Sequence, residues 1–98
     1  MTGAHAPWAA LHSLTQSLAI ALAPHGIVAA AVAPGFTSTE MAQHILDGPG
    51  GPAIRAQSPF GRVATPEEVA ATVAWLATEA PAWVSGAIVD VNGASYVR

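Results

Sequence analysis

The order of elements along this 98-residue chain, helix, strand, loop, helix, strand, predicts an α/β fold. Two observations carry this prediction. The apolar runs 27–32 and 87–91 are short, and the first does not alternate with polar residues, which is typical of strands covered on both faces of a parallel sheet. The stretches 8–23 and 66–80 repeat apolar residues every three or four positions, as helices do. Strand–helix–strand units form parallel pairs with right-handed crossovers.

The first helix is predicted over residues 8–23. Pro7 fits its first turn, and Pro24 with Gly26 is expected to end it. Apolar side chains recur along it at helical spacing, so we expect one buried stripe. That stripe is made of Trp8, Leu11, Leu14 or Thr15, Leu18 and Leu22.

The first strand, over residues 27–32, leads into the segment 33–41, which reads Ala-Pro-Gly-Phe-Thr-Ser-Thr-Glu-Met. A Pro-Gly turn frees backbone groups, and the hydroxyl side chains of this segment follow the carboxyl end of the strand. In open α/β sheets, ligands bind at that edge. The segment is therefore our first candidate for a binding site.

A long connection, residues 37–59, follows this strand. A loop of this length inside a compact domain is usually functional or mobile. A short helix is expected over residues 40–46. The run 47–52, Asp-Gly-Pro-Gly-Gly-Pro, is expected to break regular structure.

The second helix has the clearest start in the chain. Thr65 can cap it, Pro66 suits the first helical position, and Glu68 completes a capping box. We expect the helix to reach about Ala80, before Pro81, and to bury Val69, Val73, Leu76 and Ala77. Trp75 and Trp83 are expected to fill the core or an interface.

The composition is unusually apolar, with 52% hydrophobic and 9% charged residues, against about 25% charged in ordinary proteins. Either much of the surface meets other protein, or the Ala-rich composition reflects a GC-rich genome. A sheet with fewer than three strands is seldom stable alone. The unpaired edge of the first strand would also invite pairing with another chain.

Composition also excludes several classes of partner. The net charge of −3, with only three basic residues, argues against nucleic acid. No uninterrupted apolar run reaches the roughly 20 residues that span a bilayer. The four histidines lack metal-ligand spacing, and the absence of cysteine excludes thiolate sites and fits a cytoplasmic protein. We therefore expect no metal, no nucleic acid and no membrane partner.

Several motifs in order resemble the C-terminal part of the short-chain dehydrogenase/reductase family. The resemblance runs over about 90 residues, and each motif alone would be a weak signal. It implies the C-terminal part of a Rossmann-like, doubly wound parallel sheet. The segments that carry it are Ala9-Ala10-Leu11, Leu14 to Ala19, Ala23 to Ile27, Val32 to Gly35, Phe60-Gly61-Arg62, Pro66 to Ala70, Val84-Ser85-Gly86 and Val91-Asn92-Gly93.

The resemblance also implies a cofactor, NAD or NADP. It implies that Pro34 and Gly35 shape the turn on the nicotinamide side, that the Thr37 backbone meets the carboxamide, and that the Thr39 hydroxyl bonds the same group or a phosphate. Thr39 can equally cap the short helix that follows. Substrate-lid residues would be Met41 and Ile45.

The family's catalytic residues have no counterpart at the matching positions. The family uses a Tyr four residues before a Lys, which lowers the Tyr pKa so that the phenol can exchange a proton with substrate. Here those positions hold Ala4 and Trp8, and His5 is expected to be incidental. The chain has no lysine, and its one tyrosine is Tyr96. We therefore assign no catalytic residue.

These departures divide the chain into a divergent segment, residues 1–8, and a C-terminal portion of an NAD(P)-binding domain, residues 9–98. We expect a truncated oxidoreductase chain that is inactive alone, arising from a frameshift, a rearrangement or a decayed gene, or else a divergent family member. The alternative is a non-catalytic interaction module that docks on full-length family subunits. The expected partners are a second copy of the chain or such subunits.

Overall fold

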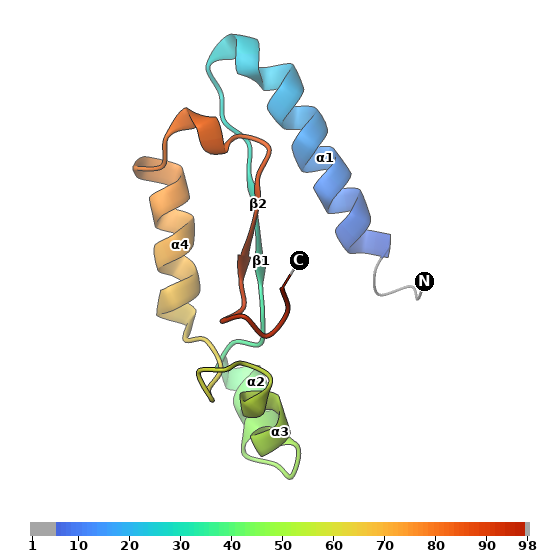
Figure 1. Ribbon diagram of the computed structural model, residues 1–98, viewed down its shortest axis with the longest axis vertical. Coiled ribbons are helices and arrows are strands. Elements are labelled where there is room, and N and C mark those ends of the chain that lie inside the picture. The colour runs from blue at the N-terminus through green and yellow to red at the C-terminus, as the bar shows by residue number, and fades with distance from the viewer. Residues whose placement is uncertain (1–5, 98) are drawn as a thin grey trace.

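The computed structural model describes residues 6–97, in which two short strands form a parallel sheet. β1 (Ala31–Pro34) pairs with β2 (Ile88–Val91), with Ala31 opposite Ile88 and Pro34 opposite Val91. Figure 1 shows α1 (Ala6–Leu22) and α4 (Pro66–Thr78) on opposite sides of this strand pair. The predicted α/β fold with a parallel pair is confirmed.

Four further short elements complete the connections. The 3-10 turns η1 (Ala23–His25) and η2 (Ala82–Val84) follow α1 and α4. The helices α2 (Glu40–Leu46) and α3 (Gly51–Ala56) lie beyond the carboxyl ends of the strands (Figure 1). Because both strands run toward this end of the molecule, their exit turns meet beside α2 and α3.

The helix α1 buries only part of the predicted stripe. Its buried residues are Thr15 and Ala19, whereas Leu11, Leu14 and Leu18 are 41–55% exposed. The side chains of Thr15 and Ala19 are small, and the Thr15 hydroxyl bonds the Leu11 carbonyl at 2.8 Å. The prediction was right for Thr15, the alternative to Leu14, and wrong for Leu11 and Leu18, which face solvent in this chain.

The first strand begins later than predicted. The structure places β1 at Ala31–Pro34 rather than at residues 27–32. Before β1, the Ala29 carbonyl accepts from the Gly86 amide, and the Ala29 amide donates to the Ser85 hydroxyl. Residues 27–30 lie alongside the turn that precedes β2, so the regular ladder starts only where β2 itself becomes extended.

The α2–α3 pair confirms one prediction and corrects another. The predicted helix over residues 40–46 is confirmed, but residues 47–52 do not all break structure, because α3 begins at Gly51. A Cβ at Gly51 would overlap the Leu46 carbonyl, which also accepts from Arg55 Nη1 at 3.1 Å. Glycine therefore allows α3 to pack closely against the end of α2.

The start of α4 is the predicted capping box. Thr65 Oγ1 accepts from the Glu68 amide, while the Glu68 carboxylate accepts from the Thr65 amide. The expected buried stripe is not found, since none of the α4 side chains is buried. Trp75 and Trp83 are 45% and 97% exposed, so neither fills a core.

The described residues enclose almost no hydrophobic core. The buried apolar side chains are Ala19 and Leu46, and no side chain of the described part is fully buried. The radius of gyration is 15.6 Å, against about 12.6 Å for a compact domain of this length. Within residues 6–97, no helix is both long and apolar enough to cross a bilayer.

Candidate functional site

The exits of β1 and β2 meet in direct backbone contact. The Gly35 amide donates to the Val91 carbonyl at 3.0 Å. A Cβ built at Gly35 would lie 2.8 Å from the Asn92 Cβ and 3.0 Å from the Asn92 Cα. Position 35 therefore requires glycine for the two exit turns to approach, which is a structural reason independent of any ligand.

Beyond Gly35, the chain pairs with the loop that precedes α4. The Ser38 amide donates to the Ala64 carbonyl at 2.9 Å, and the Ala64 amide donates to the Phe36 carbonyl at 3.2 Å. These bonds turn the backbone groups of Thr37 to the opposite side. The Thr37 carbonyl accepts from Thr39, whereas its amide donates to none of the described residues. One free N–H therefore lies at the exit of β1.

Thr39 is the N-cap of α2. Its Oγ1 accepts from the Ala42 amide at 3.1 Å, which leaves the hydroxyl hydrogen available to donate. The predicted cap is therefore confirmed. Met41 and Ile45 lie one turn apart on α2 and are 86% and 51% exposed. Their side chains form a short apolar stripe open to solvent.

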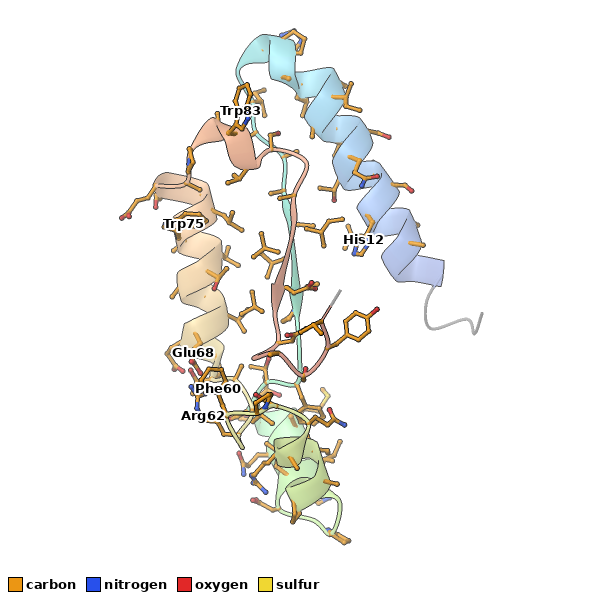
Figure 2. The ribbon with its side chains drawn as sticks, in the orientation of Figure 1. His12, Phe60, Arg62, Glu68, Trp75 and Trp83 are labelled. Atoms are coloured by element: carbon orange, nitrogen blue, oxygen red, sulfur yellow. The ribbon has the colours of Figure 1, made fainter. Side chains whose placement is uncertain are left out.

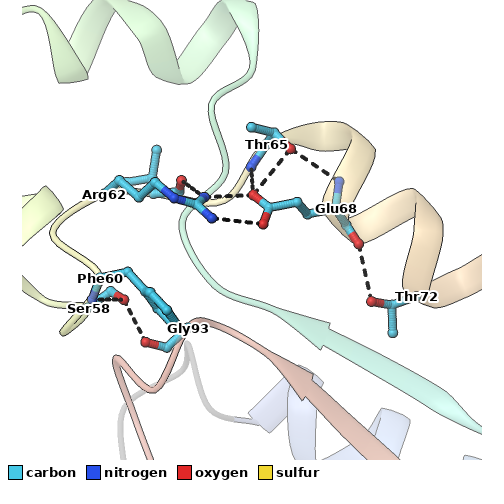
Figure 3. A network of polar contacts seen from close by, with 8 residues as sticks. Ser58, Phe60, Arg62, Thr65, Glu68, Thr72 and Gly93 are labelled. Carbon is cyan, nitrogen blue, oxygen red and sulfur yellow. Dashed lines mark hydrogen bonds and ion pairs between the residues drawn. The ribbon is translucent and has the colours of Figure 1, made fainter.

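A clasp of two hydrogen bonds, both made by Ser58, lies between the end of α3 and the exit of β2. Ser58 is buried, and its hydroxyl donates to the Gly93 carbonyl at 2.6 Å. The same oxygen accepts from the Phe60 amide at 3.2 Å. Figure 3 shows these bonds beside a second polar group at the start of α4. The end of the segment 39–58 is thus fixed to the exit of β2, and its start follows the pairing of Ser38 with Ala64.

That second group is an ion pair between Arg62 and Glu68. The guanidinium donates two bonds to the carboxylate, of 2.7 and 3.0 Å (Figure 3). This hydrogen bonding, with the bond from the Thr65 amide, lowers the Glu68 pKa to about 2 and raises the Arg62 pKa. The guanidinium also lies 6.0 Å from the centre of the Phe60 ring. The pair ties the loop to α4.

The cavity between these exits is too small for a complete site. Its volume is about 150 Å³, whereas ligand pockets usually measure about 300–1,000 Å³. Pro34, Gly35, Thr37 and Thr39 do not line it, nor do Met41 and Ile45. The side chains that line it include Phe36, Ile54, Ser58, Phe60, Asn92 and Ser95.

The described residues hold no catalytic pair of the expected kind. Tyr96 is 67% exposed, and its carbonyl accepts from the Asn92 side chain. Residues 6–97 contain no cluster of three or more His, Asp or Glu side chains able to hold a metal. Ala4, where the family's Tyr would lie, and its neighbour His5 are outside the described residues.

Comparison with known proteins shows the family to which the chain belongs. The family described as Enoyl-(Acyl carrier protein) reductase matches residues 4–94. The chain belongs to the short-chain dehydrogenase/reductase family. L-rhamnose 1-dehydrogenase (NAD(P)(+)) of Sphingomonas sp. (strain SKA58) is 41% identical over 91 residues, which are 92% of this chain and 36% of that protein. The 3-oxoacyl-[acyl-carrier-protein] reductase FabG of Aquifex aeolicus is 39% identical, over 90% of this chain and 35% of that protein.

Solved structures of the family have the same arrangement. A short-chain dehydrogenase/reductase of Brucella melitensis superposes with a TM-score of 0.82 at 31% identity, over 92% of this chain and 36% of that one. YwfH, an NADPH-dependent reductase of bacilysin biosynthesis, gives a TM-score of 0.80 at 29% identity, over 92% and 38%. The chain therefore spans about a third of the length of its short-chain dehydrogenase/reductase relatives.

Three contacts in this site were not predicted from the sequence. They are the Ser58–Gly93 clasp, the Arg62–Glu68 pair and the close approach of Gly35 to Asn92. The predicted cofactor residues Pro34, Gly35, Thr37 and Thr39 lie between the end of β1 and the N-cap of α2. The sequence does hold a signal for the ion pair. Arg62 lies three residues before the predicted cap Thr65, so its side chain can reach Glu68, which completes the capping box.

Proposed function

We propose that this chain supplies the nicotinamide-side loop and the substrate-side helix of an NAD(P)-dependent oxidoreductase site. The observation that carries the proposal is the free amide of Thr37, next to the Thr39 hydroxyl, at the carboxyl end of a parallel strand. Both groups can donate, and a nicotinamide carboxamide offers an acceptor oxygen. The residues present therefore fit that half of the cofactor.

Each residue of the turn has a separate role in this proposal. Pro34 and Gly35 set the path of the backbone, and the Thr37 amide holds the carboxamide. The Thr39 hydroxyl donates to the same group or to a phosphate while still capping α2. When bound, the cofactor would supply or accept a hydride. Met41 and Ile45 would cover the substrate side, because their exposed stripe begins one residue after the cap.

The chain alone is expected to bind weakly and to turn nothing over. Trp8 and Ala4 stand where the family has its Lys and Tyr, so no side chain at those positions can relay a proton. The small cavity at the strand exits offers no room for the adenylate half. A fragment of the cofactor should therefore bind as well as the whole.

The test is a titration of the ¹⁵N-labelled chain with nicotinamide mononucleotide, NAD and AMP, followed by amide chemical shifts. We expect shifts at Gly35, Thr37 and Thr39 with the mononucleotide and NAD, at affinities within about twofold of each other. AMP should leave these amides unmoved. If millimolar mononucleotide moves none of them, the cofactor assignment fails.

Variants at Thr39 separate cofactor contact from helix capping. Thr39→Val removes both roles, Thr39→Ser keeps both, and Thr39→Asp keeps the cap but loses the hydroxyl donor. Val should weaken mononucleotide binding about fivefold, the worth of roughly 1 kcal/mol for one hydrogen bond. Ser should restore it, and Asp should not. Thr72→Val, which removes a hydroxyl from α4, is the matched control.

A second candidate function is an interaction module, and a specific observation favours it. Large apolar side chains of α1, including Leu14 and Ile20 at 55% and 78% exposed, face solvent together with Trp83. Figure 2 shows Trp75 and Trp83 toward the C-terminal end of α4 and the following turn, and Phe60, Arg62 and Glu68 near its start. In this proposal the chain docks on other family subunits and does no chemistry.

A further inference from the structure

The exit of β2 contains a chemically labile peptide bond. Asn92 is the only asparagine in the chain, and Gly93 follows it directly. The backbone nitrogen of the next residue can attack an asparagine side chain, and this attack is easiest before glycine, because glycine has no side chain to hinder it. The pair follows the last residue of β2, so a change here alters the way the chain leaves the sheet.

The nitrogen that would attack is accessible. The Gly93 amide donates to none of the described residues, and Gly93 is exposed to solvent. Its φ is 58°, a conformation that residues with a side chain rarely adopt. Among the described residues, therefore, no hydrogen bond of this amide has to break before the nitrogen turns toward the Asn92 side chain.

The side chain that would be attacked is held beside this nitrogen. Asn92 Oδ1 accepts from the Ala94 amide at 3.0 Å, which curls the side chain over the intervening Gly93 peptide. The same bond draws electron density away from Asn92 Cγ and makes this carbon a better electrophile. Asn92 Nδ2, the leaving group, donates to the Tyr96 carbonyl at 3.0 Å on an exposed part of the chain.

We propose that Asn92 is a modification site, at which the folded chain deamidates spontaneously. The Gly93 nitrogen forms a bond to Asn92 Cγ, the bond from Cγ to Nδ2 breaks, and ammonia leaves with the proton of the Gly93 amide. Water then opens the five-membered succinimide. Opening at Cγ gives aspartate, whereas opening at the main-chain carbonyl gives isoaspartate, whose main chain runs through Cβ and Cγ. This proposal does not depend on the cofactor contact.

The isoaspartate product cannot keep the contacts of this exit. A Cβ at Gly35 would lie 2.8 Å from Asn92 Cβ, so the two exit turns leave no room for an additional main-chain atom. Gly93 would shift, and its carbonyl would lose the 2.6 Å hydrogen bond from the Ser58 hydroxyl (Figure 3). Deamidation would therefore release the end of α3 and loosen the α2–α3 segment. The reaction is irreversible, so this switch is set by the age of the chain.

The test is incubation of the chain at neutral and mildly alkaline pH, followed by peptide mass spectrometry. Deamidation adds about 1 Da to the peptide that contains Asn92. We expect the folded chain to convert at a rate within about tenfold of the same chain unfolded in urea, and faster at alkaline pH, because the attacking nitrogen must lose its proton. A folded chain that converts more than tenfold more slowly would overturn the proposal, since its structure would then protect Asn92.

Hydrogen exchange tests the consequence for the α2–α3 segment. Residues 51–60 should be protected in the fresh chain. In the aged chain their exchange should accelerate about tenfold, because a buried hydrogen bond is lost. Asn92→Asp carries the charge of the product on an unaltered main chain, so fresh Asn92→Asp should retain the rate of the fresh chain. Equal exchange in fresh and aged chains, or the same acceleration in fresh Asn92→Asp, would overturn the switch.

Asn92→Gln is the matched control for ageing. It keeps a side-chain amide, but its attack would have to close a six-membered ring, so it should convert at least about tenfold more slowly. Aged alongside the unaltered chain, Asn92→Gln should keep the exchange rate of its own fresh sample. Acceleration in this variant as well would assign the loosening to another site, such as the Asp47–Gly48 sequence, and would contradict the role of Asn92.

Discussion

The Ser58 hydroxyl donates a 2.6 Å hydrogen bond to the carbonyl of Gly93, 35 residues further along the chain. This bond holds the end of α3 against the exit of β2. The start of the same segment follows Ser38, whose amide donates to the Ala64 carbonyl at 2.9 Å. The α2–α3 pair is thus held at both ends by hydrogen bonds.

Removing the Ser58 hydroxyl should loosen this segment. Ser58→Ala leaves the Gly93 carbonyl and the Phe60 amide without their partner, at a cost of about 1–3 kcal/mol. We expect amide hydrogen exchange over residues 51–60 to accelerate by tenfold or more. Ser17→Ala, on the exposed surface of α1, should leave that exchange unchanged. Equal rates in the Ser58 variant would mean that the clasp does not hold the segment.

The Glu68 carboxyl should titrate near 2, below its ordinary value of 4.5. Because the folded pKa is the lower one, the Arg62–Glu68 pair favours the folded state above about pH 4.5. That contribution is lost as the pH falls toward 2. Carbon-13 NMR of the Glu68 carboxyl measures the titration directly. In Arg62→Gln, the pKa should rise toward 4.5.

The control for that titration is Arg55→Gln. Arg55 donates to the Leu46 carbonyl rather than to Glu68, so its loss should leave the Glu68 pKa near 2. A Glu68 pKa that stays near 2 in Arg62→Gln would assign the shift to the capping box alone.

A methyl group at Gly35 should destabilise the chain. Gly35→Ala forces the exit turns of β1 and β2 apart, since the new Cβ would lie 2.8 Å from that of Asn92. Overpacking of this kind costs about 1–3 kcal/mol. At Gly50 an added Cβ meets nothing within 4 Å, so Gly50→Ala should change stability by less than about 0.5 kcal/mol. Urea unfolding, followed by tryptophan fluorescence and circular dichroism, compares the two.

Two neighbouring residues of α2 should differ sharply in their effect on stability. Leu46 is 3% exposed, and Ile45 is 51% exposed. Leu46→Ala leaves a cavity between α2 and α3, which costs of the order of 2 kcal/mol or more. Amide exchange in α2 should accelerate accordingly, whereas Ile45→Ala should leave it nearly unchanged. Similar rates in both variants would show that Leu46 does not hold the helix pair together.

Local signals predicted the helices that begin at strong caps. Thr39 and Thr65 fix the starts of α2 and α4, and both starts are where the sequence indicates. The start of α3 was not predictable, because it depends on the contact of Gly51 with the Leu46 carbonyl and Arg55. The clasp between Ser58 and Gly93 likewise joins distant segments, which no periodicity records.

The face that α1 buries was predicted only in part, for a different reason. A hydrophobic stripe shows which side of a helix is apolar, and not whether anything covers it. Leu14 and Leu18 form the apolar side, yet the small residues Thr15 and Ala19 are the buried ones. In the same way, the unalternating run 27–32 indicates a strand covered on both faces, yet none of its residues is buried by the described part of the chain.

The central claim is that the Thr37 amide and the Thr39 hydroxyl, at the exit of β1, bind the nicotinamide half of the cofactor. Amide chemical shifts of the ¹⁵N-labelled chain, measured with nicotinamide mononucleotide and with AMP, test it most directly. The account predicts shifts at Gly35, Thr37 and Thr39 with the mononucleotide and none with AMP. No shift at these amides with millimolar mononucleotide, or equal shifts with AMP, would contradict it.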